Sequence, residues 1–177
     1  MQQQQRRFSE YERKRLRYLF SEKIEKYLDA NYGDCWLKIP EIAQLVVNAL
    51  GHFDGIRYHL FAWCIMPNHV HVIFKPISSG SELQSDLISI LHSWKSFTAH
   101  KANKILKRSG EFWQSEYYDH VIRSDEELHY YITYTLNNPV KAALCDNWEE
   151  WPWSGCSEAV KKGIEQSLAG ETPAPHS

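Results

Sequence analysis

The sequence predicts an α+β fold built on an antiparallel sheet, because strand-like and helix-like patterns alternate along the chain. Residues 58–65 are rich in aromatic and β-prone side chains, and residues 69–75 follow after a short turn at 66–68. Strands separated by so short a turn should pair antiparallel. Residues 82–106 and 124–138 instead carry apolar side chains at helical spacing, so we expect helices there.

Three further segments complete the expected set of elements. A capping-box pattern that begins at Ser9 predicts an N-terminal helix over residues 9–31. Pro40 is suited to the first turn of a second helix, which we expect to end near Gly51. Residues 112–122 are again dense in aromatic and β-branched side chains, and they predict another strand.

The chain length of 177 residues fits one domain with room for extensions. We expect that domain to cover residues 9–155. The polar residues 1–8 should be disordered, and residues 156–177, whose end is rich in proline, should form a flexible tail.

Composition excludes some classes of protein. The net charge is -2, so any site for a polyanion must be a local basic patch rather than the whole surface. The four cysteines are scattered without a C-x-x-C pair, which indicates neither a zinc knuckle nor a disulfide framework. There is no apolar run of membrane-spanning length and no signal-peptide pattern, so we expect a cytoplasmic protein with reduced thiols and no membrane partner.

Two histidines are candidates for a metal site. His69 and His71 are two positions apart in an expected strand, so their side chains point to the same face. Two imidazoles side by side on a rigid strand form half of a site for a divalent metal. The alternative interpretation is that both simply lie on a solvated sheet face.

The last expected helix carries a polar face opposite its packing side. Tyr130, Tyr134 and Asn138 are spaced by four and therefore lie above one another. If this face covers the two histidines, a metal-polarised phosphodiester could be attacked by a tyrosine, with Asn138 as a further metal ligand. The alternatives are that the tyrosines pack and that Asn138, before Pro139, marks the end of the helix.

Basic side chains that could hold DNA phosphates occur in the second half of the sequence, and exposed aromatic rings could stack on unpaired bases. The alternative is that these charges lie on solvated helix faces and that most rings fill the core. The candidate DNA-binding residues are Lys95, Lys101, Lys104, Arg108, Arg123 and Lys141.

These motifs resemble a known family. The stretch around His69-Val70-His71 resembles the His-hydrophobe-His motif of HUH endonucleases, and Tyr134-Thr-Leu-Asn-Asn-Pro-Val-Lys resembles the tyrosine helix of single-tyrosine transposases. In combination the sequence is similar to REP-associated tyrosine transposases over about residues 57–154. The other matching stretches are residues 94–98, 112–123 and 151–154.

The resemblance implies a ferredoxin-like antiparallel sheet with helices packed on one face. It implies a metal-dependent enzyme that nicks and joins single-stranded DNA beside a palindromic hairpin through a 5′-phosphotyrosine. Tyr134 would be the nucleophile, His69, His71 and Asn138 the ligands, and Mg²⁺ or Mn²⁺ the cofactor. The protein would be a monomer or a homodimer.

The start of the chain differs from the pattern of the family. Members usually begin with a strand, whereas residues 9–31 predict a helix, so we expect the first strand of the sheet to be missing. A non-catalytic single-stranded nucleic-acid binder, a truncated inactive relic and a phosphodiesterase that uses activated water are the competing hypotheses. If the histidines are ligands, cleavage should fall below about pH 6, near the pKa of free histidine.

Overall fold

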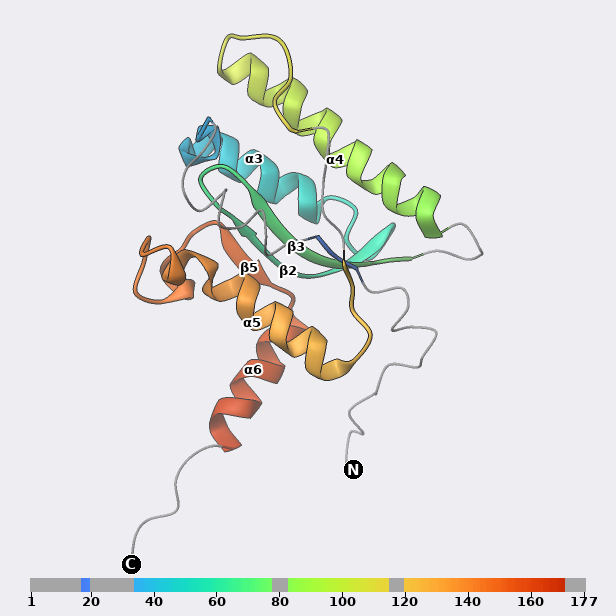
Figure 1. The fold of residues 1–177 in the computed structure, drawn as a ribbon, viewed down its shortest axis with the longest axis vertical. Coiled ribbons are helices and arrows are strands. Elements are labelled where there is room, and N and C mark those ends of the chain that lie inside the picture. The colour runs from blue at the N-terminus through green and yellow to red at the C-terminus, as the bar shows by residue number, and fades with distance from the viewer. Residues whose placement is uncertain (1–16, 20–33, 78–82, 115–119, 171–177) are drawn as a thin grey trace, which may run out of the picture.

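A computed structural model describes residues 17–19, 34–77, 83–114 and 120–170 (Figure 1). It is a mixed α+β fold, which confirms the predicted class. The strands are β1 (Arg17–Leu19), β2 (Tyr58–Ile65), β3 (Val70–Pro76), β4 (His120–Val121) and β5 (Ser154–Cys156). The α-helices are α3 (Pro40–Gly51), α4 (Leu83–Ile105), α5 (Asp125–Lys141) and α6 (Glu158–Gly170), and short 3-10 turns lie at Trp36–Lys38 and Trp148–Glu150.

The strands form one sheet in the order β4-β1-β3-β2-β5, and every pairing in it is antiparallel. The β2–β3 hairpin at its centre is the one that the sequence predicts. Its register shifts between Leu60 and Ala62, which leaves Phe61 as an extra residue in β2. Because of this bulge, Leu60 and Ala62 reach opposite faces of the sheet.

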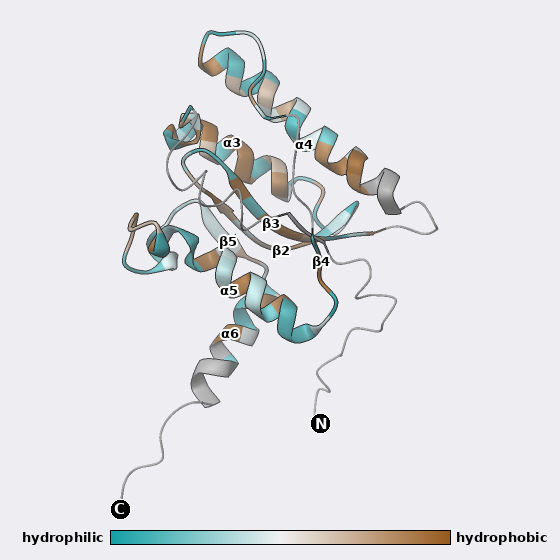
Figure 2. Cartoon of the chain, in the orientation of Figure 1, coloured by the Kyte–Doolittle hydropathy of each residue, from teal (hydrophilic) through white to brown (hydrophobic). Residues whose placement is uncertain are grey.

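Helices cover both faces of the sheet, which corrects the expectation that they pack on one face. On β3, Val72 and Phe74 join a core with α3 and α4, whereas Ile73 joins a second core with α5. Alternation along one strand thus places the helix layers on opposite sides, as Figure 1 shows. Figure 2 shows hydrophobic residues gathered on β2 and β3 between these layers.

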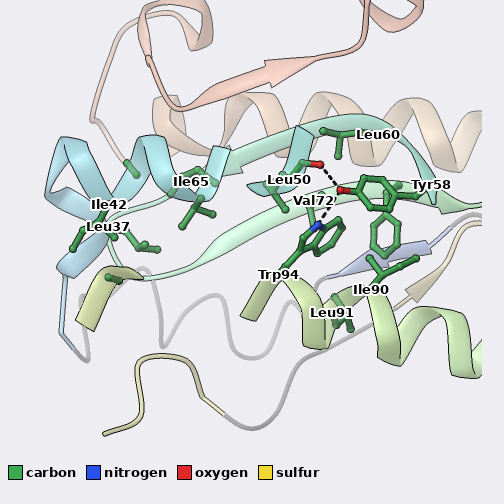
Figure 3. Close-up of a cluster of buried hydrophobic side chains, with 14 of the residues drawn as sticks. Leu37, Ile42, Leu50, Tyr58, Leu60, Ile65, Val72, Ile90, Leu91 and Trp94 are labelled. Carbon is green, nitrogen blue, oxygen red and sulfur yellow. Dashed lines mark hydrogen bonds between the residues drawn. The ribbon is translucent and has the colours of Figure 1, made fainter. Parts of the chain in front are cut away.

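The first core contains a hydrogen-bonded tyrosine, Tyr58 (Figure 3). The fully buried Tyr58 hydroxyl donates to the Leu50 carbonyl at 2.7 Å and accepts from Trp94 Nε1 at 3.0 Å. The rings of Tyr58, Phe74 and Trp94 meet edge to face, with centroids 4.9–5.8 Å apart. This network joins α3 and α4 to the β2–β3 hairpin and so fixes the sheet that carries the histidines.

The beginning of the chain differs from the prediction. Residues 17–19, expected inside a helix, form β1, which pairs with β3 and with β4. The sheet therefore has a strand from the N-terminal segment, and the expectation of a missing strand is wrong. The rest of the predicted helix, in residues 9–16 and 20–31, and the predicted disorder of residues 1–8 lie outside the described residues.

Two other elements were placed incorrectly from the sequence. Among the described residues of the predicted 112–122 segment, which exclude 115–119, strand structure is limited to β4. The tail expected from residue 156 instead contains α6, whose Val160 and Ile164 pack against the second core. Residues 171–177 are not among those described.

Gly155 in β5 should not tolerate a side chain. A Cβ at this position would lie 2.4 Å from Trp63 Cζ2, inside the ring on the neighbouring strand. We expect Gly155→Ala to lower the free energy of unfolding by about 1–3 kcal/mol through overpacking, measured by denaturant unfolding. Gly163→Ala is the matched control, because nothing lies within 4 Å of that position in α6. Equal stability of the two variants would contradict this packing.

Candidate active site

The turn between β2 and β3 holds the two histidines together. Ile65 pairs with Val70, and the Met66 N–H donates to the His69 carbonyl at 2.8 Å, which closes the turn. His69 lies just before β3 and His71 inside it, and their Nε2 atoms are 2.9 Å apart. The sequence prediction that both imidazoles share one face is confirmed.

Hydrogen bonds link Asn68, His69 and His71 in a chain. His69 Nδ1 lies 2.8 Å from Asn68 Oδ1, which can only accept a hydrogen bond, so His69 Nδ1 carries the hydrogen. The Nε2 atoms of His69 and His71 face each other, and one of the two carries the hydrogen that they share. A metal shared by both rings would bind at this place.

Burial keeps both imidazoles neutral. Desolvation lowers the pKa of His69 to about 4. The pKa of His71 also falls well below its ordinary value, first through burial and then through the charges of His69 and Lys141. Neutral imidazole is the form that binds metal, so the acid limit expected for ligation moves from about pH 6 down toward pH 4.

Helix α5 brings Tyr134 against the histidines. Ser124 caps this helix by accepting from the Glu127 N–H at 3.0 Å, and Leu128, Ile132 and Leu136 pack it onto the second core. The Tyr134 side chain is 8% exposed, and its ring meets that of His71 edge to face with centroids 6.1 Å apart.

Asn138 and Lys141 follow Tyr134 on the same helix. Asn138 is buried one turn beyond Tyr134, on the same side. The helix continues through Pro139 to Lys141, so Asn138 is not a helix end. This continuation places Lys141 Nζ 3.8 Å from the centroid of the Tyr134 ring.

The tryptophan segment after α5 makes two hydrogen bonds to the end of β2, next to the histidine turn. Trp151 Nε1 donates to the Ile65 carbonyl at 3.0 Å, and the Ile65 N–H donates to the Trp153 carbonyl at 3.0 Å. Both bonds hold the last residue of β2, immediately before the turn that carries His69. The segment at 151–154 is therefore a structural support for the site.

The predicted basic residues do not form one surface. Arg108 binds the Asn103 side chain and the Glu111 carbonyl and lies 4.1 Å over the Trp36 ring, while Lys95 bonds to the Gln114 carbonyl. These contacts give both residues structural roles. Lys101 and Lys104 are exposed on α4, across the sheet from Tyr134, whereas Lys141 adjoins it.

Arg123 lies at the far end of α5 from Lys141. Its side chain is exposed, and its backbone N–H donates to Glu127. Because α5 spans 17 residues, the two basic residues are separated by about 25 Å along the helix. Of the six basic candidates, Lys141 alone is placed beside the histidine and tyrosine cluster by the contacts of the described residues.

Comparisons with known proteins identify the family. The family model described as "Transposase IS200 like" matches residues 48–135, a span that includes both histidines and Tyr134. The chain belongs to the IS200-like transposase family. Among curated relatives of this transposase is a putative REP-associated tyrosine transposase of Haemophilus influenzae, 25% identical over 66% of this chain and 69% of that protein.

A second curated relative and a solved structure carry names of the same kind. The REP-associated tyrosine transposase of Escherichia coli K12 is 25% identical over 60% of this chain, and the match spans 59% of that protein. A solved REP-associated tyrosine transposase bound to a REP hairpin has a TM-score of 0.53 at 17% identity. That match covers 98% of this chain and 89% of the other, and it establishes the shared fold.

The described part of the chain contains no helix long and apolar enough to cross a membrane. Within the same residues no group of three or more His, Cys, Asp or Glu side chains is arranged to hold a metal. A metal at His69 and His71 would therefore need a ligand of another kind, and the candidate is the amide of Asn138, which is buried one helical turn beyond Tyr134.

The sequence alone does not reveal two contacts of the candidate site. Asn68, which fixes the ring hydrogen of His69, was interpreted only as a turn residue. Lys141 was interpreted as a phosphate contact, although its spacing of seven from Tyr134 corresponds to two helical turns on the same face. That spacing is the signal that could have linked the two residues.

The buried histidines should make the folded chain sensitive to acid. An unfolded chain protonates histidine near pH 6.5, whereas folded His69 resists protonation to about pH 4. Unfolding thus takes up protons in this window, and the free energy of unfolding should fall as pH drops from 6.5 to 4, by about 3 kcal/mol for His69. Urea unfolding at pH 7, 6 and 5 checks this, and His69→Gln should flatten the dependence; an unchanged slope would contradict it.

Proposed function

We propose that this protein nicks single-stranded DNA beside palindromic hairpins and transfers the cut strand through a phosphotyrosine on Tyr134. The observation that carries the proposal is the edge-to-face contact of the buried Tyr134 ring with His71, which is itself paired with His69. This contact supports the proposal because it joins the tyrosine of α5 to the histidine pair of the β2–β3 turn, which would be the nucleophile and the metal ligands. Family membership and the printed names of the relatives support the same reaction.

In the proposed step, the Tyr134 oxygen attacks the phosphorus of a phosphodiester. The bond from phosphorus to the 3′ oxygen breaks, and that oxygen leaves with the electron pair. The phenol loses one proton and the leaving oxygen gains one, so the step is balanced. A phosphodiester bond is retained as a 5′-phosphotyrosine, which a free 3′ hydroxyl can later attack to rejoin DNA.

The residues present fit a divalent metal. Both imidazoles are buried and neutral, and their Nε2 atoms face each other 2.9 Å apart, so the two nitrogens could be ligands of one ion. When bound, the metal would polarise a phosphate oxygen and orient the phosphorus. The metal would be Mg²⁺ or Mn²⁺, and the Asn138 amide oxygen would be the third ligand.

Lys141 is assigned a phosphate contact beside the nucleophile, because its ammonium lies over the Tyr134 ring. We expect Lys141→Met to slow cleavage about tenfold or more and to reduce the salt dependence of DNA binding by about one phosphate contact. Anisotropy titrations at several salt concentrations measure the slope. Lys162→Met, at an exposed position on α6, is the control. An unchanged slope for Lys141→Met would contradict this role.

The test is a covalent-adduct assay. Purified protein is mixed with labelled hairpin DNA from the flanks of its own gene, with Mn²⁺, with Mg²⁺ or with EDTA, and is run on a denaturing gel. A metal-dependent band of protein joined to DNA is the expected result. Cleaved DNA without that band would favour hydrolysis by activated water. DNA binding without either product would favour a non-catalytic binder or an inactive relic.

A further inference from the structure

We propose that Tyr130 is a stacking platform for the unpaired base next to the phosphate that Tyr134 attacks. The inference rests on the proposed function and deepens it, because it assigns a nucleotide contact to a residue outside the nucleophile and ligand set. The class of ligand is a nucleobase of single-stranded DNA. The contact would help to set which nucleotide is cut.

The first support is the geometry of the aromatic side chains on α5. The rings of Tyr130 and Tyr134 are stacked, with centroids 6.2 Å apart and planes inclined by 27°. Tyr134 is buried, whereas Tyr130 is 54% exposed. A base that stacks on the exposed part of Tyr130 would therefore lie about one helical turn from the nucleophile.

The second support is that the Tyr130 ring is held in place. Tyr131 meets it edge to face with centroids 5.2 Å apart, and Tyr131 in turn packs against the second core and lies 5.3 Å from the His120 ring. A ring restrained by its neighbours loses little conformational entropy when a base stacks on it. Such an exposed, restrained ring is typical of sites that bind unpaired bases.

The third support is the charge along α5. The acidic residues of this helix, at 125–127, are confined to its first turn, and none occurs between Tyr130 and Lys141. The two oxygens of Glu127 accept hydrogen bonds from His120 and the Arg123 N–H. Lys141 would thus attract a phosphate of the DNA strand to the Tyr134 end of this helix, and the neighbouring base would lie toward Tyr130.

Phe97 provides a comparison on the other side of the molecule. It is 50% exposed on α4, with Lys101 Nζ 5.9 Å from its ring centroid. It therefore has similar exposure and a basic neighbour, but the sheet separates its helix from Tyr134. Phe97→Ala is the matched control for Tyr130→Ala, because it removes an exposed ring that cannot touch a base at the nucleophile.

The experiment uses hairpin DNA with 2-aminopurine at successive unpaired positions, bound to the full chain carrying Tyr134→Phe so that no strand is cut. Stacking on an aromatic ring quenches the fluorescence of this base. We expect quenching at one position, its loss in Tyr130→Ala, and its retention in Tyr130→Phe and Phe97→Ala. The dissociation constant should rise about 5- to 150-fold in Tyr130→Ala, the range of one base–aromatic stack.

The outcomes separate this inference from the proposed function. Quenching that survives in Tyr130→Ala, or that is lost equally in Tyr130→Phe, would overturn the stacking role even if the wild-type chain forms the adduct. Quenching that depends on the ring without any adduct in the wild type would support stacking and overturn the nicking reaction. An absence of DNA binding would overturn both.

Discussion

Tyr134→Phe should abolish the covalent protein–DNA adduct, with a loss of cleavage of at least about a thousandfold. The substitution removes only the hydroxyl oxygen that would attack phosphorus. The ring that meets His71, Tyr130 and Lys141 remains, so the packing of α5 should be preserved. The measurement is single-turnover cleavage of labelled hairpin DNA with Mn²⁺.

Two controls make this result specific. Tyr130→Phe removes a hydroxyl from the neighbouring exposed ring and should leave the adduct yield unchanged. DNA affinity of Tyr134→Phe, measured without cleavage, should match that of the wild-type chain. An adduct of normal yield in Tyr134→Phe would contradict the role of this tyrosine.

His71→Gln should have the second largest effect, because it removes one of two buried imidazoles that face each other. We expect Mn²⁺ affinity to fall by more than the 10- to 100-fold typical of losing a group that merely supports a ligand, and cleavage to fall with it. Calorimetric titration of Mn²⁺ into the protein without DNA gives the affinity independently of activity. Chemical unfolding shows whether the variant remains folded.

The matched control is His92→Gln, which changes an exposed histidine on α4 across the sheet. It should bind Mn²⁺ and cut DNA like the wild-type chain. If His71→Gln binds Mn²⁺ with unchanged affinity while folded, the metal site is not at the β2–β3 turn. The proposal for His69 and Asn138 would then fail as well.

The central part of the site could be predicted because its determinants are local. The short turn fixes the β2–β3 hairpin, and the period of two puts His69 and His71 on one face. Helical spacing likewise places Tyr134 and Asn138 on one side of α5. The approach of Tyr134 to His71 depends on how α5 packs on the second core, so spacing alone could suggest it but not establish it.

The predictions from the sequence are wrong where contacts between residues far apart in the chain determine the structure. β1 has three residues in a charged segment, and its strand conformation follows from pairing with β3 and β4 rather than from its own propensity. Phe112 and Trp113, expected in a strand, instead contact Trp36 and the Thr98 hydroxyl, which holds their segment on α4. Among the described side chains of α6, Val160 and Ile164 pack against the second core within a largely polar stretch, and two such residues do not predict a helix.

The most direct test of the central claim is to identify the amino acid joined to DNA. The adduct formed with Mn²⁺ is digested with protease and nuclease, and mass spectrometry locates the remaining nucleotide. We expect a 5′-phosphate bonded to Tyr134 in the peptide that also contains Tyr130 and Tyr131. Fragmentation that places the nucleotide on either of those two tyrosines, or on a residue outside α5, would contradict the proposed mechanism.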